Sequence, residues 1–367
     1  MTDPRVQTVA KILVDYSVEV QANQLVRISG APEGAPLILA VYQLVLERGA
    51  HPFLQVGLED AEELLYKYAS DAQLDYVPRF MKGMVEEIDA TITVWTDANT
   101  KRLTNVDPGR QSRRAVALRP LSDRLLERAA KKELRWTGTL YPTQAFAQDA
   151  EMSLREFEDF VYKACLVHEP DPIQCWRKIS KEQQRLVDWL NKAKQIRVIG
   201  PDAELELEVT DRTWINCDGH ENFPDGEIFT GPIEDSINGY IRYTYPACAY
   251  GREVEDVWLW FKEGKVVKAT AGKNEEFLLK MLETDAGACY VGEFAFGTNP
   301  GIQRFTKNTL FDEKIGGTIH LALGKGYPES GSKNKSAIHW DMVCDLRKGG
   351  EVWVDGILFL KDGKIVI

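Results

Sequence analysis

A histidine and an aspartate lie two residues apart within an otherwise apolar segment near the C-terminal end of the chain, Ala337–Val343. Side chains alternate between the two faces of a strand, so His339 and Asp341 share one face and Trp340 lies on the other. Burying one unpaired polar group costs roughly 2–7 kcal/mol. The pair therefore needs a compensating partner, and Trp340 is expected to pack in the core on the opposite face.

Three further segments each place an ionisable residue next to apolar ones. His320 lies in TIHLALG on the face of Thr318 and Ala322, Glu293 lies in VGEFAFG, and Glu227 lies in FPDGEIFTG. Each residue alone is typical of a satisfied core histidine or a buried salt bridge. Together with His339 and Asp341 they supply two imidazoles and three carboxylates, which suit one or two divalent metal ions. In a two-metal site one of the carboxylates can bridge the ions.

The elements that would carry these residues are mostly strands. Period-two alternation over 196–215, a hairpin over 254–272 and closing strands over 350–367 indicate a β-rich second half. A helix over 274–287 interrupts it, with Asn274 expected as its N-cap. His320 and His339 are 19 residues apart, which is compatible with two neighbouring strands joined by a loop.

The first half alternates strand and helix patterns. Strands are predicted over 23–30, 51–57 and 89–97, and helices over 6–18, 36–50, 61–77 and, further on, 154–167 and 179–195. This alternation predicts a mostly parallel sheet with helices on its faces. Neither G-x-G-x-x-G nor G-x-x-x-x-G-K-[ST] is present, so no nucleotide site is predicted.

The expected fold class is therefore α/β, in two domains. An N-terminal α/β domain over residues 1–195 with a mostly parallel sheet precedes a β-rich α+β metal-binding domain over 196–367. The length of 367 residues allows two domains, each with a core of its own.

Composition excludes several partner classes. The formal net charge is −11, which argues against nucleic-acid binding through the phosphate backbone. No run approaches the ~20 apolar residues of a membrane span, and no signal peptide is predicted.

The six cysteines are scattered without a C-x-x-C motif. They are expected to be reduced thiols, and the protein to be cytoplasmic.

Four motifs in the second half, in this order, resemble the metallopeptidases of the aminopeptidase T and aminopeptidase S group. They cover most of residues 221–345 and read NFPDGEIFTGP, YVGEFAFGTNP, LFDEKIGGTIHLALGKGYP and SAIHWDMVCDL. The α/β first half is compatible with that family. The chain differs from its best-known members by a shorter segment between Tyr327 and His339, and by the residues IGGTI before His320.

The resemblance implies a metal-dependent aminopeptidase with two divalent metal ions per chain, zinc, cobalt or manganese, and a metal-activated water. It assigns the metal ligands Glu227, Glu293, His320, His339 and Asp341, with Glu293 as the bridging ligand. It also assigns Tyr327 as the active-site tyrosine and Glu313 as an acidic residue near the metals.

The implied partners are peptide substrates with a free N-terminus and a second copy of the chain, as a homodimer. In the corresponding mechanism Tyr327 either hydrogen-bonds to the oxyanion of the attacked carbonyl or completes the ligand shell of a metal ion. Glu313 acts as general base, and Glu293 is counted with them among the catalytic residues.

Two alternatives remain open. Relatives of this peptidase fold include ring-cleaving dioxygenases of dihydroxypyridines, in which two histidines and a carboxylate hold one Fe(II). Glu293 favours the peptidase, since such dioxygenases are expected to lack it. The other alternative is a metal-stabilised binding protein without catalytic activity, which would bind metal but turn over no peptide.

Overall fold

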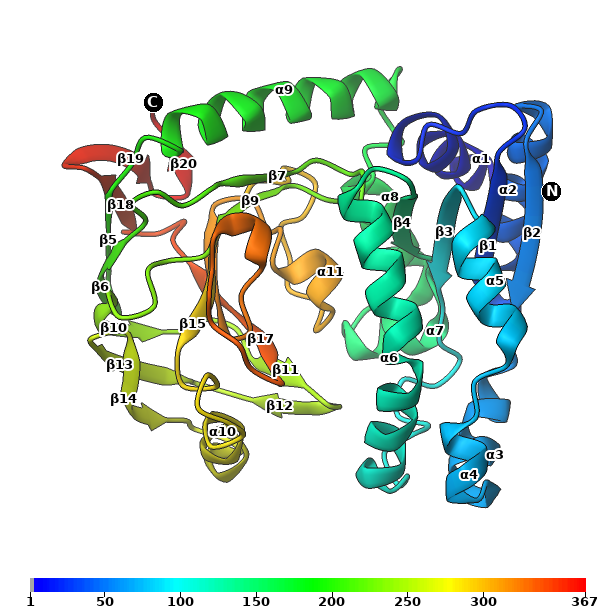
Figure 1. Ribbon diagram of the computed structural model, residues 1–367. Helices are drawn as coiled ribbons and strands as arrows, with labels where there is room; N and C mark the ends of the chain where they lie inside the picture. The colour runs from blue at the N-terminus through cyan, green and yellow to red at the C-terminus, as the bar shows by residue number, and fades with distance from the viewer. Residues whose placement is uncertain (1–2) are drawn as a thin grey trace. The chain divides into compact units, whose positions relative to one another are not determined.

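The computed structural model describes residues 3–367 and divides them into two compact units (Figure 1). The first unit runs to Ile173 and includes Gly219–Pro224, and the second comprises Gln174–Asp218 and Asp225–Ile367. This division lies earlier in the chain than the predicted boundary near residue 195. The reason is α9 (Pro172–Leu190), whose apolar side chains Leu186, Val187 and Leu190 join the core of the second unit.

The first unit is built on a five-stranded parallel sheet. Its strand order is β2-β1-β3-β4-β8, and each neighbouring pair is parallel. The strands are β1 (Leu25–Gly30), β2 (His51–Val56), β3 (Ala90–Trp95), β4 (Arg135–Leu140) and β8 (Asn222–Phe223). The predicted parallel sheet is therefore confirmed, although β4 and β8 carry no sequence pattern that was used to predict them.

Eight α-helices accompany this sheet among the described residues of the first unit. They are α1 (Pro4–Ile12), α2 (Ala35–Glu47), α3 (Glu59–Tyr68), α4 (Asp71–Asp75), α5 (Arg79–Glu87), α6 (Pro108–Ala130), α7 (Gln144–Asp149) and α8 (Leu154–Ala164). A π-helical segment, η1 (Leu13–Ser17), and a 3₁₀ turn, η2 (Pro32–Gly34), complete the unit.

The prediction of one continuous helix over 61–77 is wrong, because the helix is interrupted near Ser70. Ser70 caps a new helix there, and its side chain forms a reciprocal capping box with Gln73. Two shorter helices, α3 and α4, therefore replace it.

The second unit contains an eight-stranded and a five-stranded sheet. The larger sheet has the order β14-β13-β10-β6-β5-β18-β19-β20, and the smaller has the order β17-β16-β15-β9-β7. All paired neighbours in both are antiparallel. The larger sheet comprises β5 (Gln195–Gly200), β6 (Ala203–Glu208), β10 (Asn238–Arg242), β13 (Trp258–Lys262), β14 (Lys265–Thr270), β18 (Glu351–Val354), β19 (Ile357–Lys361) and β20 (Lys364–Ile365).

The smaller sheet comprises β7 (Ile215–Cys217), β9 (Glu227–Thr230), β15 (Val291–Gly297), β16 (Thr318–Gly324) and β17 (His339–Asp345). A separate ribbon pairs β11 (Ala247–Ala249) with β12 (Arg252–Val254). The remaining elements are α10 (Glu275–Leu282), α11 (Thr309–Asp312) and the 3₁₀ turn η3 (Pro328–Ser330).

Asn274 does not cap α10 as predicted. It sits at the N-cap position in a left-handed conformation and makes no side-chain capping bond. Its amide instead donates to the carbonyl oxygen of Glu253, at 2.7 Å. The Asn274 side chain therefore hydrogen-bonds to a neighbouring segment and is not available to cap the helix.

The smaller sheet turns one face to the core of the second unit. Alternate residues of its strands are buried there against side chains of the larger sheet and of α9. Those of the smaller sheet are Ile228, Val291, Phe294, Phe296, Ile319, Leu321, Leu323, Trp340, Met342 and Cys344. Trp340 is only 3% exposed, which confirms the expectation that it anchors the face opposite His339 and Asp341.

This architecture confirms the predicted fold class, an α/β unit with a parallel sheet followed by a β-rich unit. Among residues 3–367 no helix combines the length and the apolar composition that crossing a membrane requires.

Candidate metal centre

The five predicted ligands lie on the same face of the smaller sheet, opposite the core. Strand register brings them together: Glu293 and Asp341 both pair with Ala322, on either side of β16. His320 pairs with Ala295, His339 with Gly324, and Glu227 with Gly297. The residues between the ligands are thus alanine and glycine, whose small side chains leave the space above the sheet to the ionisable groups.

A β-bulge at Gly292 sets the direction of Glu293. Val291 pairs with Leu323 on the core face, and the register then shifts so that Glu293 pairs with Ala322 on the ligand face. Without the additional residue, Val291 and Glu293 would point to the same face, because side chains alternate along a strand. Gly292 fits only without a side chain, since a Cβ there would lie 2.4 Å from the carbonyl oxygen of Gly324.

Glu293 lies between the two imidazoles. Its Oε1 is 3.2 Å from His320 Nε2, and its Oε2 is 3.7 Å from His339 Nε2. Each imidazole nitrogen also has a second carboxylate, Glu227 Oε2 at 3.4 Å from His320 and Asp341 Oδ1 at 3.5 Å from His339. The site is thereby divided into two imidazole–carboxylate pairs that share one central carboxylate.

Two carboxylate oxygens in this cluster lack a hydrogen-bond donor. Glu227 Oε2 and Asp341 Oδ1 are buried and make no hydrogen bond in the described structure. Leaving a buried acceptor unsatisfied costs about 1–3 kcal/mol, and more when it is charged. Both oxygens face an imidazole nitrogen, which is the arrangement expected of ligands around a cation. The residues present therefore fit a divalent metal ion.

A hydrogen bond from Nδ1, the ring nitrogen that does not face the cluster, fixes the orientation of His339. Its Nδ1 lies 2.7 Å from the carbonyl oxygen of Lys325, which can only accept a hydrogen bond. Nδ1 therefore carries a proton, and the lone pair of Nε2 is available to the cluster once Nε2 has lost its own proton. A hydrogen bond of this kind commonly orients histidines that bind metals.

The pKa values of the cluster are shifted because several ionisable groups are buried close together. Burial raises the pKa of Glu227 well above its usual value, although Lys314 and His320 oppose the change. Burial also raises the pKa of Glu293. For His320, burial favours the neutral ring, but Glu293 and Glu227 prevail and raise its pKa to about 9.

His339 and Asp341 form a strongly polarised pair. Burial lowers the pKa of His339, but Asp341 and Glu293 outweigh it and raise the pKa to about 10. Burial likewise opposes ionisation of Asp341, yet His339 prevails and lowers its pKa to about 2. The metal-free cluster therefore holds protons where a metal ion would supply positive charge.

Tyr327 and Glu313 lie next to the ligands. The ring centroid of Tyr327 is 5.1 Å from that of His339 and 5.4 Å from that of Phe229. Although 37% of Tyr327 is exposed, desolvation of its phenol and the nearby carboxylates raise its pKa far above the usual value, so it remains a proton donor. Glu313 has a carboxylate oxygen within 4.8 Å of potential ligand atoms of His320 and Asp341. The structure thus brings all seven predicted site residues into one region.

Comparisons with known proteins agree with this arrangement. A family model described as thermophilic metalloprotease (M29) matches residues 2–365. The chain belongs to this family. Aminopeptidase 2 of Geobacillus stearothermophilus is 28% identical over 396 residues, covering 97% of this chain and 94% of that protein. Aminopeptidase AmpS of Bacillus subtilis strain 168 is 26% identical over 392 residues, covering 98% and 94%.

A solved structure, wild-type AmpT from Thermus thermophilus, matches this M29 metallopeptidase with a TM-score of 0.87. The match covers 99% of each chain at 22% identity, and it shows that the two proteins share a fold. The predicted family is therefore confirmed, as is the predicted enzyme class, a metal-dependent hydrolase of the aminopeptidase type. The matches favour this class over the ring-cleaving dioxygenase and over the non-catalytic binding protein.

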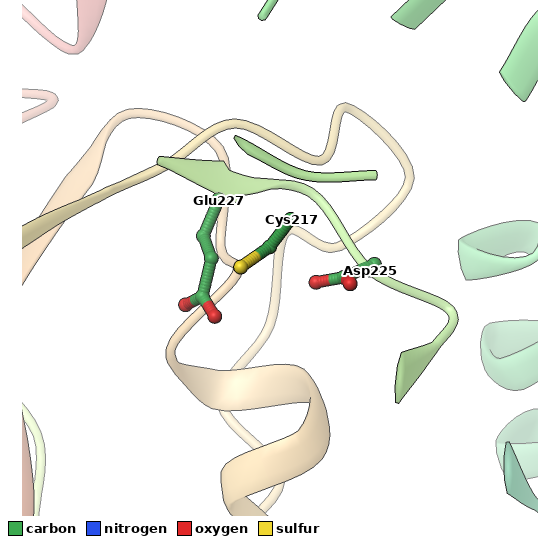
Figure 2. A group of neighbouring side chains, drawn as sticks. All are labelled: Cys217, Asp225 and Glu227. Atoms are coloured by element: carbon green, nitrogen blue, oxygen red, sulfur yellow. The ribbon is translucent and has the colours of Figure 1, made fainter. Parts of the chain in front are cut away.

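Three further residues of the M29 metallopeptidase reach the centre and were not predicted. Lys314, which follows α11, is fully buried, and its Nζ contacts Glu313 and lies 3.6 Å from Glu227 Oε1 and 3.9 Å from Asp225 Oδ1. Cys217 and Asp225 lie beside Glu227 (Figure 2). A lysine directly after Glu313 in an apolar context is a sequence signal that could have identified the first of them.

Proposed function

We propose that the protein is an aminopeptidase whose centre holds two divalent cations, with Glu293 as the ligand common to both. His320 and Glu227 would hold one cation, and His339 and Asp341 the other. The observation that carries this proposal is the position of Glu293, each of whose oxygens faces a different imidazole nitrogen. A mononuclear site would not need a carboxylate placed in this way.

The charge of the cluster supports the same number of cations. Asp225, Glu227, Glu293, Glu313 and Asp341 supply five carboxylates, and Lys314 supplies one ammonium group. With neutral imidazoles, four negative charges are uncompensated in a largely buried region, which is costly. Two divalent cations would neutralise them. Imidazole and carboxylate ligands suit zinc, cobalt or manganese.

The chemistry would be hydrolysis of the first peptide bond. Divalent cations held at such a centre acidify a bound water and polarise the substrate carbonyl. The hydroxyl of Tyr327 would donate a hydrogen bond to the oxyanion that develops on that carbonyl. Glu313 would accept a proton from the water and pass it to the leaving amine. The acidic face of the cluster would bind a free N-terminal ammonium group of the peptide.

The proposal is tested with Glu293→Gln, which keeps the size of the side chain and removes its charge. We expect the variant to lose at least one metal ion per chain and its activity to fall at least about 100-fold. Mutation of a residue that only hydrogen-bonds to a metal ligand already lowers metal affinity or activity about 10–100-fold. Elemental analysis and hydrolysis of leucyl and arginyl peptides measure the two effects. Glu206→Gln, on the exposed outer side of β6, is the matched control.

Three results would overturn the proposal. The first is full peptidase activity of Glu293→Gln with metal still bound. The second is a wild-type enzyme that takes up no divalent metal, and the third is hydrolysis of N-acetylated peptides as fast as free ones. Oxygen uptake with iron and 2,5-dihydroxypyridine, without peptide hydrolysis, would instead support the dioxygenase.

The homodimer and the cytoplasmic location also remain proposals. None of the six cysteines is paired in a disulfide bond among the described residues, which suits a reducing compartment. The homodimer rests on the family resemblance of the four sequence motifs. The mass of the purified enzyme in solution, determined by light scattering, tests it, and a monomer at working concentration would contradict it.

A further inference from the structure

Lys314 is a cation built into the centre. Its side chain is completely buried, and it contacts three carboxylates, those of Glu313, Glu227 and Asp225. The contact with Glu227 is through Oε1, whereas Oε2 faces His320 Nε2 at 3.4 Å. The two oxygens of Glu227 are thus divided between the lysine and the candidate metal site.

The same lysine borders a second group of potential ligands. Cys217, Asp225 and Glu227 each have a ligand atom within 4.8 Å of the others, and Figure 2 shows their side chains directed into one space. A thiolate with two carboxylates suits a divalent cation of intermediate softness, such as zinc or cadmium. We refer to the space between Cys217, Asp225 and Glu227 as the corner. Without Lys314, the corner would offer a third metal site that shares Glu227 with the catalytic centre.

We propose that Lys314 closes this corner to a further metal ion and so keeps Glu227 as a one-oxygen ligand of the catalytic centre. The proposal rests on the proposed two-metal function. A divalent cation at the corner would lie beside the ammonium group in a region of low dielectric, where like charges repel strongly. It would also compete for Oε1 of Glu227. The lysine, held covalently, supplies the positive charge without being exchangeable.

The first experiment compares the wild-type enzyme with Lys314→Met, which keeps the length of the side chain and removes its charge. Both are loaded with excess cobalt(II), freed of weakly bound metal and analysed for metal content. We expect about two ions per wild-type chain and about three in the variant, as the thiol of Cys217 releases its proton on binding. A thiolate-to-cobalt charge-transfer band should appear in the variant alone. Its kcat should fall about 10–100-fold.

Two further variants assign the additional ion. In Lys314→Met combined with Cys217→Ser, the charge-transfer band should disappear and the third ion should be lost. Lys273→Met removes a lysine from an exposed ion pair with Glu255 and should behave as the wild type does. If Lys314→Met bound two ions, showed no charge-transfer band and kept its kcat, the role assigned to Lys314 would be wrong while the two-metal function stood.

The inference can also be tested without altering Lys314, in case that variant fails to fold. The wild-type enzyme and Cys217→Ser are titrated with cadmium, and their thiolate-to-cadmium absorption is compared. We expect no difference, because the corner is closed in both proteins. Stronger absorption in the wild type would show that Cys217 binds cadmium beside Lys314, which overturns the inference. A wild type that binds no metal at all would overturn the two-metal function as well.

Discussion

A buried carboxylate between two imidazoles is stable only if positive charge is supplied nearby. In the metal-free centre that charge comes from protons on His320 and His339 and from the ammonium group of Lys314. Lys314 is covalently attached and stays, whereas the imidazole protons are exchangeable for metal. This difference distinguishes the residues that we propose to bind metal from Lys314, which we propose to position Glu227 among them.

The exchange of protons for metal predicts how metal affinity depends on pH. Both imidazoles must lose their protons before Nε2 can bind a cation, and their pKa values are raised to about 9 for His320 and about 10 for His339. The affinity should therefore rise steadily as the pH increases from about 6.5 to 9. Competition with a chromophoric chelator measures this, and an affinity independent of pH would contradict it.

The same shifts predict the stability of the metal-free enzyme. The pKa of a histidine in an unfolded chain is about 6.5, so the folded protein holds protons that the unfolded chain loses. Their contribution to the free energy of unfolding is complete below about pH 6.5. It is lost as the pH rises through about 9 and about 10, the pKa values of His320 and His339 in the folded protein. Urea unfolding of enzyme freed of metal by a chelator should show this decline in the free energy of unfolding between pH 7 and 10. The metal-loaded enzyme should show a smaller decline.

Tyr327 offers a prediction that separates catalysis from metal binding. Its ring packs against His339, but its hydroxyl is not among the predicted ligands. Tyr327→Phe should keep the metal content and lower kcat about 10²–10³-fold, the usual effect of removing one donor to an oxyanion. Steady-state kinetics and elemental analysis measure both quantities. Tyr240→Phe, half-buried in β10, is the control, and loss of metal in Tyr327→Phe would indicate a structural role.

At the scale of elements, the bulge in β15 decides which side of the sheet is polar. Val291 must face the core and Glu293 must face the ligands, although the two residues are only two positions apart. The additional residue, Gly292, reconciles these requirements by shifting the register. The strand can pass close to β16 at this point because Gly292 has no side chain.

Gly292→Ala should therefore disturb both folding and metal binding. Its Cβ would lie 2.4 Å from the carbonyl oxygen of Gly324 and 2.5 Å from backbone atoms of Lys325, whose carbonyl orients His339. We expect a loss of about 1–3 kcal/mol in the free energy of unfolding, together with reduced metal content. Urea unfolding and elemental analysis test this. Gly83→Ala, in α5 with no atom near its Cβ position, should leave metal content unchanged.

At the scale of the whole molecule, each unit has its own sheet and buried apolar residues. Val26, Ile28, Ile92 and Val94 are buried in the parallel sheet of the first unit, whereas α9 contributes to the core of the second. All seven predicted site residues belong to the second unit. Metal should therefore stabilise that unit directly.

Removal of metal should shift one thermal transition more than the other. A ligand that binds only the folded state adds about 2.7 kcal/mol of stability at about 100 times its Kd. Calorimetry of the enzyme with and without chelator should show one transition moving to lower temperature and a second that changes little. A single transition that moves as a whole would show instead that the two units unfold together.

Much of this protein follows from its sequence alone. Alternation of side chains placed His339 and Asp341 on one face and Trp340 on the other, since local strand geometry fixes these directions. The α/β half with its parallel sheet and the β-rich half followed from helix and strand periodicities, and four ordered motifs indicated the family. These features depend on short-range geometry or on residue identity, which a sequence displays directly.

Only the tertiary structure decided the geometry of the centre and which further groups, among them Lys314, reach it. Register between distant strands brought Glu227 and Glu293 to the histidines, and the bulge at Gly292 turned Glu293 away from the core. The contacts of Lys314 with Glu227 and Asp225 could not be predicted, because they join residues from separate segments. The end of the first unit likewise depended on where α9 packs. Long-range pairing decides such features, and periodicity within one segment carries no information about it.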